Sequence, residues 1–570
     1  MELHAAAAVA ARPLALDAPT LVHAFQYTAA QRPDEVALRN PGDAVSLTWR
    51  EYAQREERIA AGLAAVGVER GDAVGLMLVN RPEFHLVDTA VLHLGATPFS
   101  VYNTSTPEQV AHQFANAGTR VVVTERHFLP VVRAAGASEI VLVEDLERLE
   151  AEGESSFRFT ETWQAVRPSD LATIIYTSGT TGPPKGVELT HANAMAQCEA
   201  SAARVPLTPG GHAMSYLPSA HVVDRWTCHW WASLTHGFTV TSIADMRTVI
   251  LMLPGLRPTT WGGVPRIWEK LQHTLTSQGV DDPEALSDEA RAGLRARLGL
   301  DRVEHLGGGA APMAIDVLRY FDALGLPIAE AWGMSELAGA GTANPHGAIR
   351  HGTCGTALPG VELKLADDAE LLVRGPIVMR GYRGDPAATA AAIDDEGWLR
   401  TGDVAHIDDD GYVSIVDRKK ELIISAGGKN MSPANIESGL VGSSPLIAHA
   451  VAIGDRRPYV SALVVLDPDA AVDFAAEHGI DDASVTGLSG EPALQLAIQA
   501  AVDAANARLS RVERIKRFAV LPEEWHAGGE QLTPTLKLKR RAIGVRYAAE
   551  IDALYASGSG RFSPGHEPVR

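Results

Sequence analysis

Residues 176–186 read YTSGTTGPPKG, a stretch that combines hydroxyl side chains, glycines and prolines with one lysine. Glycine and proline interrupt helices and strands, so this stretch is expected to be a loop. The apolar run LATIIYT leads directly into it, which is untypical of a surface linker. A buried strand that ends in a glycine-rich loop is a common way to hold phosphate, because backbone amides and hydroxyls donate to the phosphate oxygens. The stretch therefore predicts a phosphate site.

The groups available in this loop suit the phosphates of a nucleotide. A Walker-type loop requires Gly-Lys followed by Ser or Thr, whereas Lys185 follows Pro184 and precedes Gly186. Kinase and GTPase functions of that type are therefore not supported. The loop offers several hydroxyls, two glycines that free backbone amides, and one cation for accumulated negative charge. These residues are Thr177, Ser178, Thr180 and Thr181, then Gly179 and Gly182, then Lys185.

Composition limits the classes of function. The chain has 70 acidic and 50 basic residues, a balance that argues against a broad nucleic-acid surface. Its three cysteines are far apart in the sequence, so neither a zinc site nor a disulfide framework is expected, and a reducing cytoplasm fits. No apolar run has the length of a membrane span. Peripheral contact with a membrane surface stays open, as do a monomer and a homodimer.

The elements that must position the loop alternate along the first part of the chain. A helix is predicted near 48–66, with Thr48 and Glu51 at the spacing of a capping box. Nearly continuous apolar strands at 72–79, 96–102 and 119–125 alternate with helices at 82–95 and 106–118. This pattern predicts an α/β fold with parallel sheets covered on both faces. Ligands on such sheets bind beyond the carboxyl ends of the strands, where we expect the loop.

The chain changes character near residue 417. Residues 394–418 are predicted to form short antiparallel strands with a turn at Asp410 and Gly411. Later residues predict two paired strands, a long helix and a further strand, which is enough for a small α+β domain. We therefore predict a large domain at 1–417, a small domain at 418–555, and a disordered tail at 556–570 that is low in apolar residues.

Further motifs follow in an order that resembles a known family. After YTSGTTGPPKG come YLPSAHVVDR, PTTWGGVPRIWEKL, LGGGAAPM, EAWGMSE, GWLRTGDVAHIDDDGYVSIVDRKKELIISAGGKNMSP and LTPTLKLKRR. Together they resemble the adenylate-forming enzymes, and most closely the long-chain fatty acyl-CoA synthetases. The resemblance implies a large N-terminal domain of stacked, mostly parallel αβ sheets plus a distorted barrel, and a small mobile α+β C-terminal domain. It also implies a reaction in which a fatty acid attacks ATP to give an acyl-adenylate and pyrophosphate, and coenzyme A then displaces AMP.

The resemblance assigns roles at the nucleotide site. Glu336, with Thr177, takes the Mg²⁺ position, and a carboxylate suits such a hard cation. Trp332 stands where the family usually has a tyrosine that stacks on adenine, and Ser335 stands where threonine is common. Asp403 would hold both ribose hydroxyls. The remaining nucleotide-site residues are Gly307, Gly308, Gly309 and Ala310 beside the adenine, Gly333 within the Trp332 motif, and Arg418 near the ribose and phosphates.

The resemblance also assigns the reacting centre and a hinge. His221 would lie near the acyl group and the α-phosphate. Lys537 corresponds to the lysine that assists adenylation, although Lys539 is an alternative and this chain has Thr-Leu-Lys where Ser-Gly-Lys is commoner. Lys420 would be the hinge about which the small domain turns between the two steps. Gly427 and Gly428 would then border the pantetheine arm of coenzyme A.

Several alternatives remain at this level. Trp226, Trp230 and Trp231 could line an acyl tunnel or belong to the core. The chain could be a fatty acyl-AMP ligase that loads a separate carrier protein, or a ligase for aryl or medium-chain acids. A nucleotide-binding scaffold without catalysis is also conceivable, although the presence of Lys185, Glu336, Asp403 and Lys537 disfavours it.

Overall fold

The structure is a computed structural model. It describes residues 12–154, 156–177, 183–309, 311–424, 430–533 and 536–556. Some of the predictions fall outside these ranges. They concern the loop residues Ser178, Gly179, Thr180, Thr181 and Gly182, then Ala310, Gly427 and Gly428, and the tail from residue 557 onward.

The first part of the chain folds as the predicted alternation of strands and helices. Thr48 caps α2 (Trp49–Ala65), and the reciprocal bonds of a capping box join it to Glu51. The strands form a four-stranded parallel sheet in the order β4-β3-β5-β6. Its strands are β3 (Ala73–Met77), β4 (Thr97–Ser100), β5 (Val121–Thr124) and β6 (Glu139–Leu142). Helix α3 (Pro82–His93) connects β3 to β4, and α4 (Pro107–Ala117) connects β4 to β5. Every residue of β3, β4 and β5 is buried, as expected for a sheet covered on both faces.

A second sheet carries the glycine and tryptophan motifs. Its strands β11 (Thr260–Gly263), β12 (His305–Gly308) and β13 (Ile328–Met334) run parallel. The chain then turns back, and β14 (Gly339–Ala343) pairs antiparallel with β13. The short 3₁₀ helix η6 (Ser335–Leu337) lies in this turn and contains Glu336. The carboxyl end of β13 is therefore the place where Trp332 and Glu336 are held.

The phosphate loop connects two antiparallel strands, so the prediction that it follows a strand of a parallel sheet is wrong. Strand β7 (Leu171–Thr177) pairs with β8 (Lys185–Thr190), and Thr177 lies opposite Lys185. A connection this short closes a hairpin, whereas a parallel crossover needs a dozen or more residues. On its other side β8 pairs with β18 (Gly381–Tyr382).

The predicted antiparallel strands near residue 400 are present. Strands β16 (Glu362–Leu365), β17 (Glu370–Arg374), β19 (Leu399–Ile407) and β20 (Val413–Arg418) form one sheet. The turn between β19 and β20 contains Gly411 with a φ of 82°, a conformation that favours glycine. In this hairpin Asp403 lies directly opposite Arg418.

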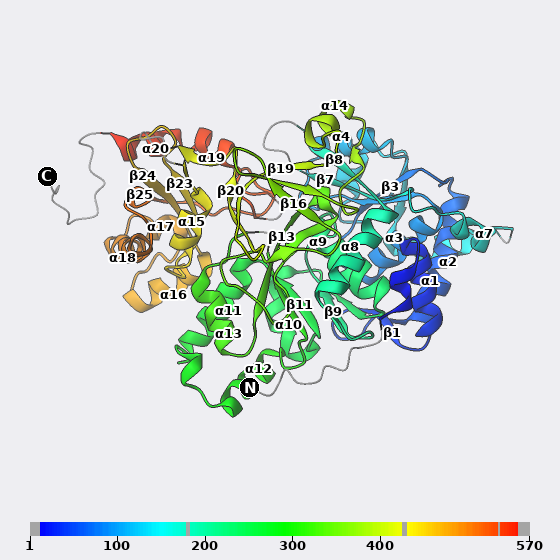
Figure 1. Ribbon diagram of the computed structural model, residues 1–570, viewed down its shortest axis with the longest axis horizontal. Helices are drawn as coiled ribbons and strands as arrows, with labels where there is room; N and C mark the ends of the chain where they lie inside the picture. Colours follow the sequence, from blue (N-terminus) through cyan, green and yellow to red (C-terminus); the bar gives the residue numbers. More distant parts are fainter. Residues whose placement is uncertain are drawn as a thin grey trace.

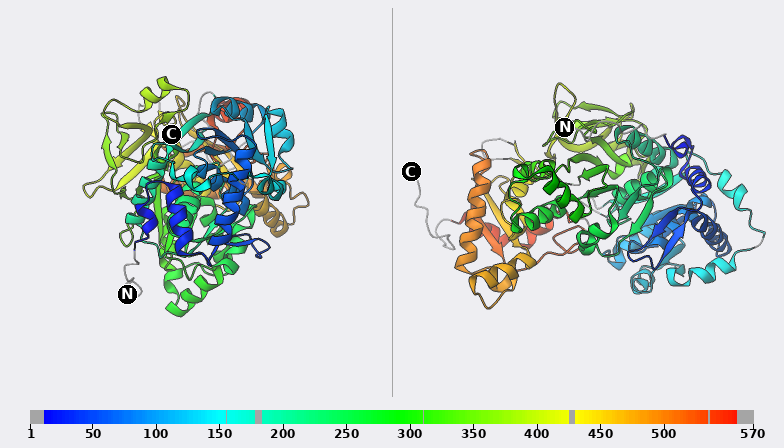
Figure 2. Two further views of the ribbon diagram at one scale, coloured as in Figure 1. Left: turned by 90° about the vertical axis from the view of Figure 1, so that its right-hand side faces the viewer. Right: turned by 90° about the horizontal axis from the view of Figure 1, so that it is seen from below.

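The C-terminal part has a sheet and a hydrophobic core of its own. Strand β23 (Ile447–Ile453) pairs antiparallel with β24 (Val460–Leu466), which pairs parallel with β25 (Ile515–Leu521). Helices α15 (Pro433–Val441) and α18 (Pro492–Arg508) contribute apolar residues to the core on this sheet. Figures 1 and 2 show this yellow-to-red segment at one end of the molecule, with the blue N-terminal segment at the other. The domain boundary after residue 417 stays a prediction. None of the helices that the structure describes is long and apolar enough to cross a membrane.

Candidate active site

Lys185 and Glu336 approach each other through Tyr382. The Tyr382 hydroxyl donates to Glu336 Oε1 at 2.8 Å. The Lys185 amine lies 4.9 Å from the centre of the Tyr382 ring, within range of a cation–π contact. Burial raises the pKa of Tyr382, as does the neighbouring Glu336 carboxylate, so the phenol keeps the proton that it donates. Tyr382 could not be assigned from the sequence, because a tyrosine after glycine carries no signal until its neighbours are known.

Thr177 stands at the mouth of the phosphate loop. It is half-buried at the last position of β7, opposite Lys185. The hairpin thus brings its hydroxyl and the lysine to the same end of the two strands.

Asp403 is held by two donors. Its Oδ2 accepts from the Trp332 indole Nε1 at 2.8 Å, and its Oδ1 pairs with Arg418 Nε at 2.7 Å. Burial raises the pKa of the Asp403 carboxyl, and this effect outweighs the opposing influence of Arg418 and Trp332. Each carboxylate oxygen has a second lone pair, so both can still accept from a vicinal diol.

Trp332 contacts more of the protein than its predicted stacking role requires. Its residue surface is only 9% exposed. A Cβ at Gly341 would lie 3.0 Å from the ring, so a side chain there would press against the indole. Stacking on adenine stays a prediction. The hydrogen bond to Asp403 was missed, although the indole N–H that tryptophan brings in place of tyrosine was the available signal.

The glycines of the two motifs permit close approach of backbones. A Cβ at Gly333 would lie 2.0 Å from the Gly339 carbonyl oxygen, which excludes any side chain there. At Gly308 and Gly309 a Cβ would lie 3.0 Å from atoms of β13. Gly307 lies on β12, and a Cβ there would have more room. Ser335 begins η6 and is buried. Gly333, Gly308 and Gly309 therefore have packing reasons, whatever they also offer an adenine, whereas Gly307 has none.

The His221 ring is neutral, and its hydrogen-bond donor can be assigned to one of the two ring nitrogens. It caps the short helix α9 (Val222–Asp224), where its Nδ1 accepts from the Val223 N–H at 3.3 Å. Burial lowers the pKa of His221 to about 4, and the Lys537 charge contributes. The ring is therefore uncharged near pH 7, and because Nδ1 accepts, Nε2 carries the proton. His221 can thus donate one hydrogen bond to an oxygen.

Lys537 and Lys539 have different surroundings. Lys539 Nζ donates to the Gly529 carbonyl at 2.7 Å, within the C-terminal part. Burial lowers the pKa of Lys537, and the Arg418 charge lowers it further. The carboxylates of Asp403, Glu421 and Glu336 oppose this shift. Lys537 is nevertheless exposed to solvent, so its amine is surrounded by charged groups without being closed off.

The backbone before Lys537 is strained. Leu536 has a φ of 62°, in the left-handed region. Glycine adopts this conformation freely, while an L side chain costs about 1 to 2 kcal/mol. The commoner Ser-Gly-Lys spelling therefore suits the backbone better than the Thr-Leu-Lys of this chain. Leu536 packs against the hydrophobic cluster of β24 and the last helices, which offsets part of this cost.

Lys420 lies in the turn that follows β20. The Glu421 amide donates to the Arg418 carbonyl at 2.9 Å, so the turn spans residues 418–421. Arg540 connects this turn to the rest of the C-terminal part. Its Nε donates to Glu421 at 3.1 Å, and its two Nη atoms donate to the Glu437 carboxylate at 2.6 and 2.7 Å.

A buried ion pair supports the segment that carries His221. Arg225 and Asp88 are fully buried, with 2.6 Å between Nη1 and Oδ1. Arg225 Nε also donates to the Ser219 carbonyl at 3.1 Å, two residues before His221. Arg225 begins η3 (Arg225–Thr235), a π-helix, a form that is rare and frequent at functional sites. This pair could not be predicted from the sequence, because charged residues are usually exposed.

The three tryptophans near His221 separate into two groups. Trp230 and Trp231 belong to the hydrophobic core. Trp226 is only partly buried, and its Nε1 donates to Ser201 Oγ at 2.9 Å. A Cβ at Gly339 would lie 2.8 Å from the Trp226 ring, which places that ring beside the turn containing Glu336.

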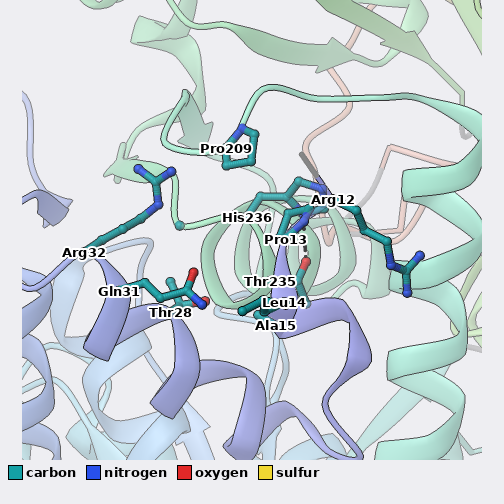
Figure 3. Close-up of a pocket in the computed structure, with 11 residues that line it drawn as sticks. Arg12, Pro13, Leu14, Ala15, Thr28, Gln31, Arg32, Pro209, Thr235 and His236 are labelled. Carbon is teal, nitrogen blue, oxygen red and sulfur yellow. Dashed lines mark hydrogen bonds between the residues drawn. The ribbon is translucent and has the colours of Figure 1, made fainter. Parts of the chain in front are cut away.

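A cavity of about 420 Å³ lies elsewhere, at the C-terminal end of η3. Figure 3 shows Arg12, Arg32 and His236 among the residues around it. None of the predicted site residues lines this cavity. It therefore has no connection to the chemistry of the motifs.

Comparisons with known proteins agree with this geometry. Residues 25–383 match the family model described as AMP-binding enzyme, and residues 420–559 match the model of the AMP-binding enzyme C-terminal domain. The fadD11 protein of Mycobacterium tuberculosis, which bears the name of a fatty-acid–CoA ligase, is 46% identical over 70% of this chain and 76% of its own. The long-chain-fatty-acid–CoA ligase FadD15 of Mycobacterium bovis is 34% identical over 92% of this chain and 95% of its own.

The fold is also that of solved structures. The O-succinylbenzoate coenzyme A synthetase of Bacillus subtilis, in complex with ATP and magnesium ion, superimposes with a TM-score of 0.70 at 22% identity. The match covers 91% of this chain and 98% of that one. The motifs, the convergence of their side chains and these relatives lead to one conclusion: the chain belongs to the AMP-binding, adenylate-forming enzymes, and within them to the fatty-acid–CoA ligases.

Proposed function

We propose that the protein is an ATP-dependent, AMP-forming acyl-CoA synthetase for long-chain fatty acids. The observation that carries this proposal is the meeting of two distant parts of the chain. Lys537 comes from the C-terminal part, yet its amine feels the charges of Asp403 and Glu336 and itself lowers the pKa of His221. A cation under the influence of two carboxylates, next to a neutral histidine donor, suits the union of a carboxylate with a polyphosphate.

The first step would use the groups in the following way. Asp403 accepts from the ribose hydroxyls, while Trp332 and Arg418 fix its orientation. Lys185 and the hydroxyls of the loop, Thr177 among them, bind the outer phosphates. Lys537 bridges the fatty-acid carboxylate and the α-phosphate, and it stabilises the charge that develops as pyrophosphate leaves. His221, through Nε2–H, donates to an oxygen at the same centre.

The residues present fit a magnesium ion. The Glu336 carboxylate is buried and has one oxygen held by Tyr382, whose ring also contacts Lys185, and Thr177 lies opposite that lysine at the hairpin end. Magnesium takes few protein ligands and completes its shell with phosphate oxygens and water. Glu336, with Thr177, would therefore hold it. When bound, the ion would neutralise phosphate charge and make pyrophosphate a better leaving group.

The second step would require the small domain to turn. We propose a domain boundary after residue 417 and a hinge at Lys420, within the turn that follows β20. Rotation there would withdraw Lys537 and bring the segment of Gly427 and Gly428 to the pantetheine arm. The coenzyme A thiolate then attacks the acyl carbon and AMP leaves, so the thioester forms without a further reactant.

The long-chain assignment rests on the names of the curated relatives and on the surroundings of Trp226. This partly buried ring beside the Glu336 turn is the candidate wall for an acyl chain. Apolar walls suit a fatty acid better than an amino acid, whose ammonium group would require a carboxylate.

A panel of acids tests the proposal. The protein is incubated with ATP, Mg²⁺ and coenzyme A, and AMP and thioester are measured for acids of increasing chain length and for aryl acids. Long-chain acids are expected to give both products in equal amounts. AMP without free thioester, restored by a carrier protein, would instead indicate an acyl-AMP ligase. A preference for aryl or medium-chain acids would overturn the substrate class, and ATP binding without acid-dependent pyrophosphate release would indicate a non-catalytic protein.

A further inference from the structure

We infer that Tyr382 is a positioning residue of the adenylating step, holding Glu336 for the metal with its hydroxyl and Lys185 for the phosphates with its ring. This inference rests on the proposed function and adds to it a residue that none of the motifs assigns. Tyr382 is the one contact that Lys185 and Glu336 share among the interactions of the described residues.

The backbone around Tyr382 is fixed on two sides. Toward the phosphate hairpin, the Arg383 amide donates to the Gly186 carbonyl at 2.8 Å, one residue after Lys185. Toward the metal site, the Met379 amide donates to the carbonyl of Glu336 itself, also at 2.8 Å. The segment 379–383 is therefore a bridge between the two motifs.

Ion pairs hold this bridge in register. Glu188 of β8 forms two ion pairs, one from each carboxylate oxygen, with Arg380 at 2.7 Å and with Arg383 at 3.1 Å. Thr389 accepts from the Tyr382 amide at 2.9 Å. The tyrosine thus lies on a strand with little freedom to shift, which is what a positioning residue requires.

The Tyr382 side chain contacts two groups, Glu336 through its hydroxyl and Lys185 through its ring. The hydroxyl occupies Glu336 Oε1, which fixes the carboxylate orientation and leaves Oε2 for a further ligand. The ring keeps the Lys185 amine at 4.9 Å from its centre. A lysine that is otherwise exposed at the first position of β8 thereby gains a preferred place. Both effects act on groups proposed to bind ATP and its metal, and neither touches the acyl chain.

Tyr382→Phe separates the two roles, since it removes the hydroxyl and keeps the ring. The Mg²⁺ concentration for half-maximal acid-dependent pyrophosphate release is expected to rise about tenfold, because a hydrogen bond to a charged group is lost. Calorimetric titration with Mg·ATP in the absence of acid gives a second readout, and a similar loss of affinity is expected there. Thioester formation from supplied acyl-adenylate should keep its rate. Tyr382→Leu should further weaken ATP binding, because it also removes the ring under Lys185.

Tyr412→Phe is the matched control. Like Tyr382, Tyr412 has a cationic side chain over its ring, in this case Arg350 at 4.0 Å from the ring centre. Its hydroxyl donates to the Ala348 carbonyl at 2.7 Å. Among the interactions of the described residues, Tyr412 has none with a proposed catalytic residue. Its variant should match the wild type in both Mg²⁺ titrations, and its melting temperature shows what a lost tyrosine hydroxyl costs in stability.

A double variant decides whether Tyr382 acts through Glu336. In a Glu336→Gln background, Tyr382→Phe should cause no further rise in the Mg²⁺ requirement, because the group it orients is already impaired. Additive effects, or an unchanged Mg²⁺ requirement in Tyr382→Phe alone, would overturn the inference while the wild type still releases pyrophosphate. If the wild type shows no acid-dependent pyrophosphate release, the proposed function itself fails.

Discussion

Lys537 and Lys539 stand two residues apart, yet only one of their amines faces the nucleotide-site residues. Lys537→Ala should reduce acid-dependent pyrophosphate release at least 100-fold, since it removes a cation from the reacting centre. It should still allow coenzyme A to react with supplied acyl-adenylate. Pyrophosphate release and thioester formation are measured separately.

Lys539→Ala provides the comparison. Its amine is held by the Gly529 carbonyl, so its loss should affect the adenylation rate by only a few-fold. If Lys539→Ala were the inactive variant and Lys537→Ala remained active, the assignment of the adenylation lysine would be reversed.

The sequence could predict residue types better than residue contacts. The motifs named Asp403, Glu336 and Trp332, because their order along the chain matches a family. They could not reveal that Trp332 donates to Asp403 or that Tyr382 donates to Glu336. Such contacts join residues 71 and 46 positions apart, and their geometry depends on how three sheets are packed.

Among the elements, π-helix η3 depends on the buried pair of Arg225 and Asp88. Arg225→Met removes the permanent cation beside the buried Asp88 carboxylate and leaves His229 Nε2, at 3.1 Å, as its remaining ion-pair partner. It should lower the free energy of unfolding by about 3 kcal/mol. Differential scanning fluorimetry should show a lower melting temperature. Asp88→Asn in the same chain should restore part of the loss, because it removes the buried negative charge.

Arg291→Met is a surface control for this experiment. Arg291 pairs with the exposed Asp288 three residues earlier on α12 (Asp288–Leu298). Surface pairs contribute little, so a change below about 1 kcal/mol is expected. Equal destabilisation by Arg291→Met and Arg225→Met would contradict the importance given to burial.

Elements themselves were largely predictable, and the exceptions have physical causes. The apolar strands predicted the parallel sheet, and the capping box at Thr48 predicted the start of α2. Both predictions are confirmed, because burial and capping act locally. The pairing of β7 with β8 was predicted wrongly, because strand direction depends on the partner and not on strand composition. The π-helix was not anticipated, because most of its residues are buried and the apolar pattern therefore shows no distinct period.

At the scale of the whole molecule, the motif GGVPRIWEKL proves to contact the C-terminal part. Arg266 and Lys270 of α11 (Pro265–Ser277) pair with Asp467 at 2.5 Å and Asp469 at 3.1 Å. Arg266→Ala should slow pyrophosphate release about two- to fivefold, because it weakens the arrangement that presents Lys537. The effect should diminish in high salt, where the wild type loses the same attraction.

The Arg291→Met variant again serves as comparison, since its ion pair lies within one helix. Pyrophosphate release is followed at low and high ionic strength for all three proteins. A rate for Arg266→Ala that equals the wild type at low salt would show that this interface does not assist adenylation.

The stability of the whole chain should fall in acid. Burial lowers the pKa of His93 to about 3 and that of six other histidines to about 4, so the unfolded chain binds more protons below its histidine pKa of 6.5. Asp224 and Glu330 have pKa values raised to about 7 by burial and act in the opposite sense. The six histidines with a pKa of about 4 are His191, His212, His221, His236, His305 and His449.

The histidines outnumber these acids, so stability should increase with pH between about 4 and 6.5. Each of these histidines favours the unfolded chain as the pH falls from 6.5 toward its lowered folded-state pKa, by at most about 1.4 kcal/mol per pH unit. Melting temperatures measured across this range should fall steadily from pH 6.5 downward. A constant or higher melting temperature at pH 5 than at pH 7 would contradict this balance.

Arg540 has a consequence for the timing of the reaction. It lies three residues after Lys537. Its guanidinium donates to Glu421, which is next to the proposed hinge, and to Glu437 of α15. If the small domain turns as proposed, Lys537 moves together with Arg540 and its carboxylate partners. Departure of the amine and arrival of the thiol would then be one event, and the proposed adenylate would not wait between two half-assembled sites.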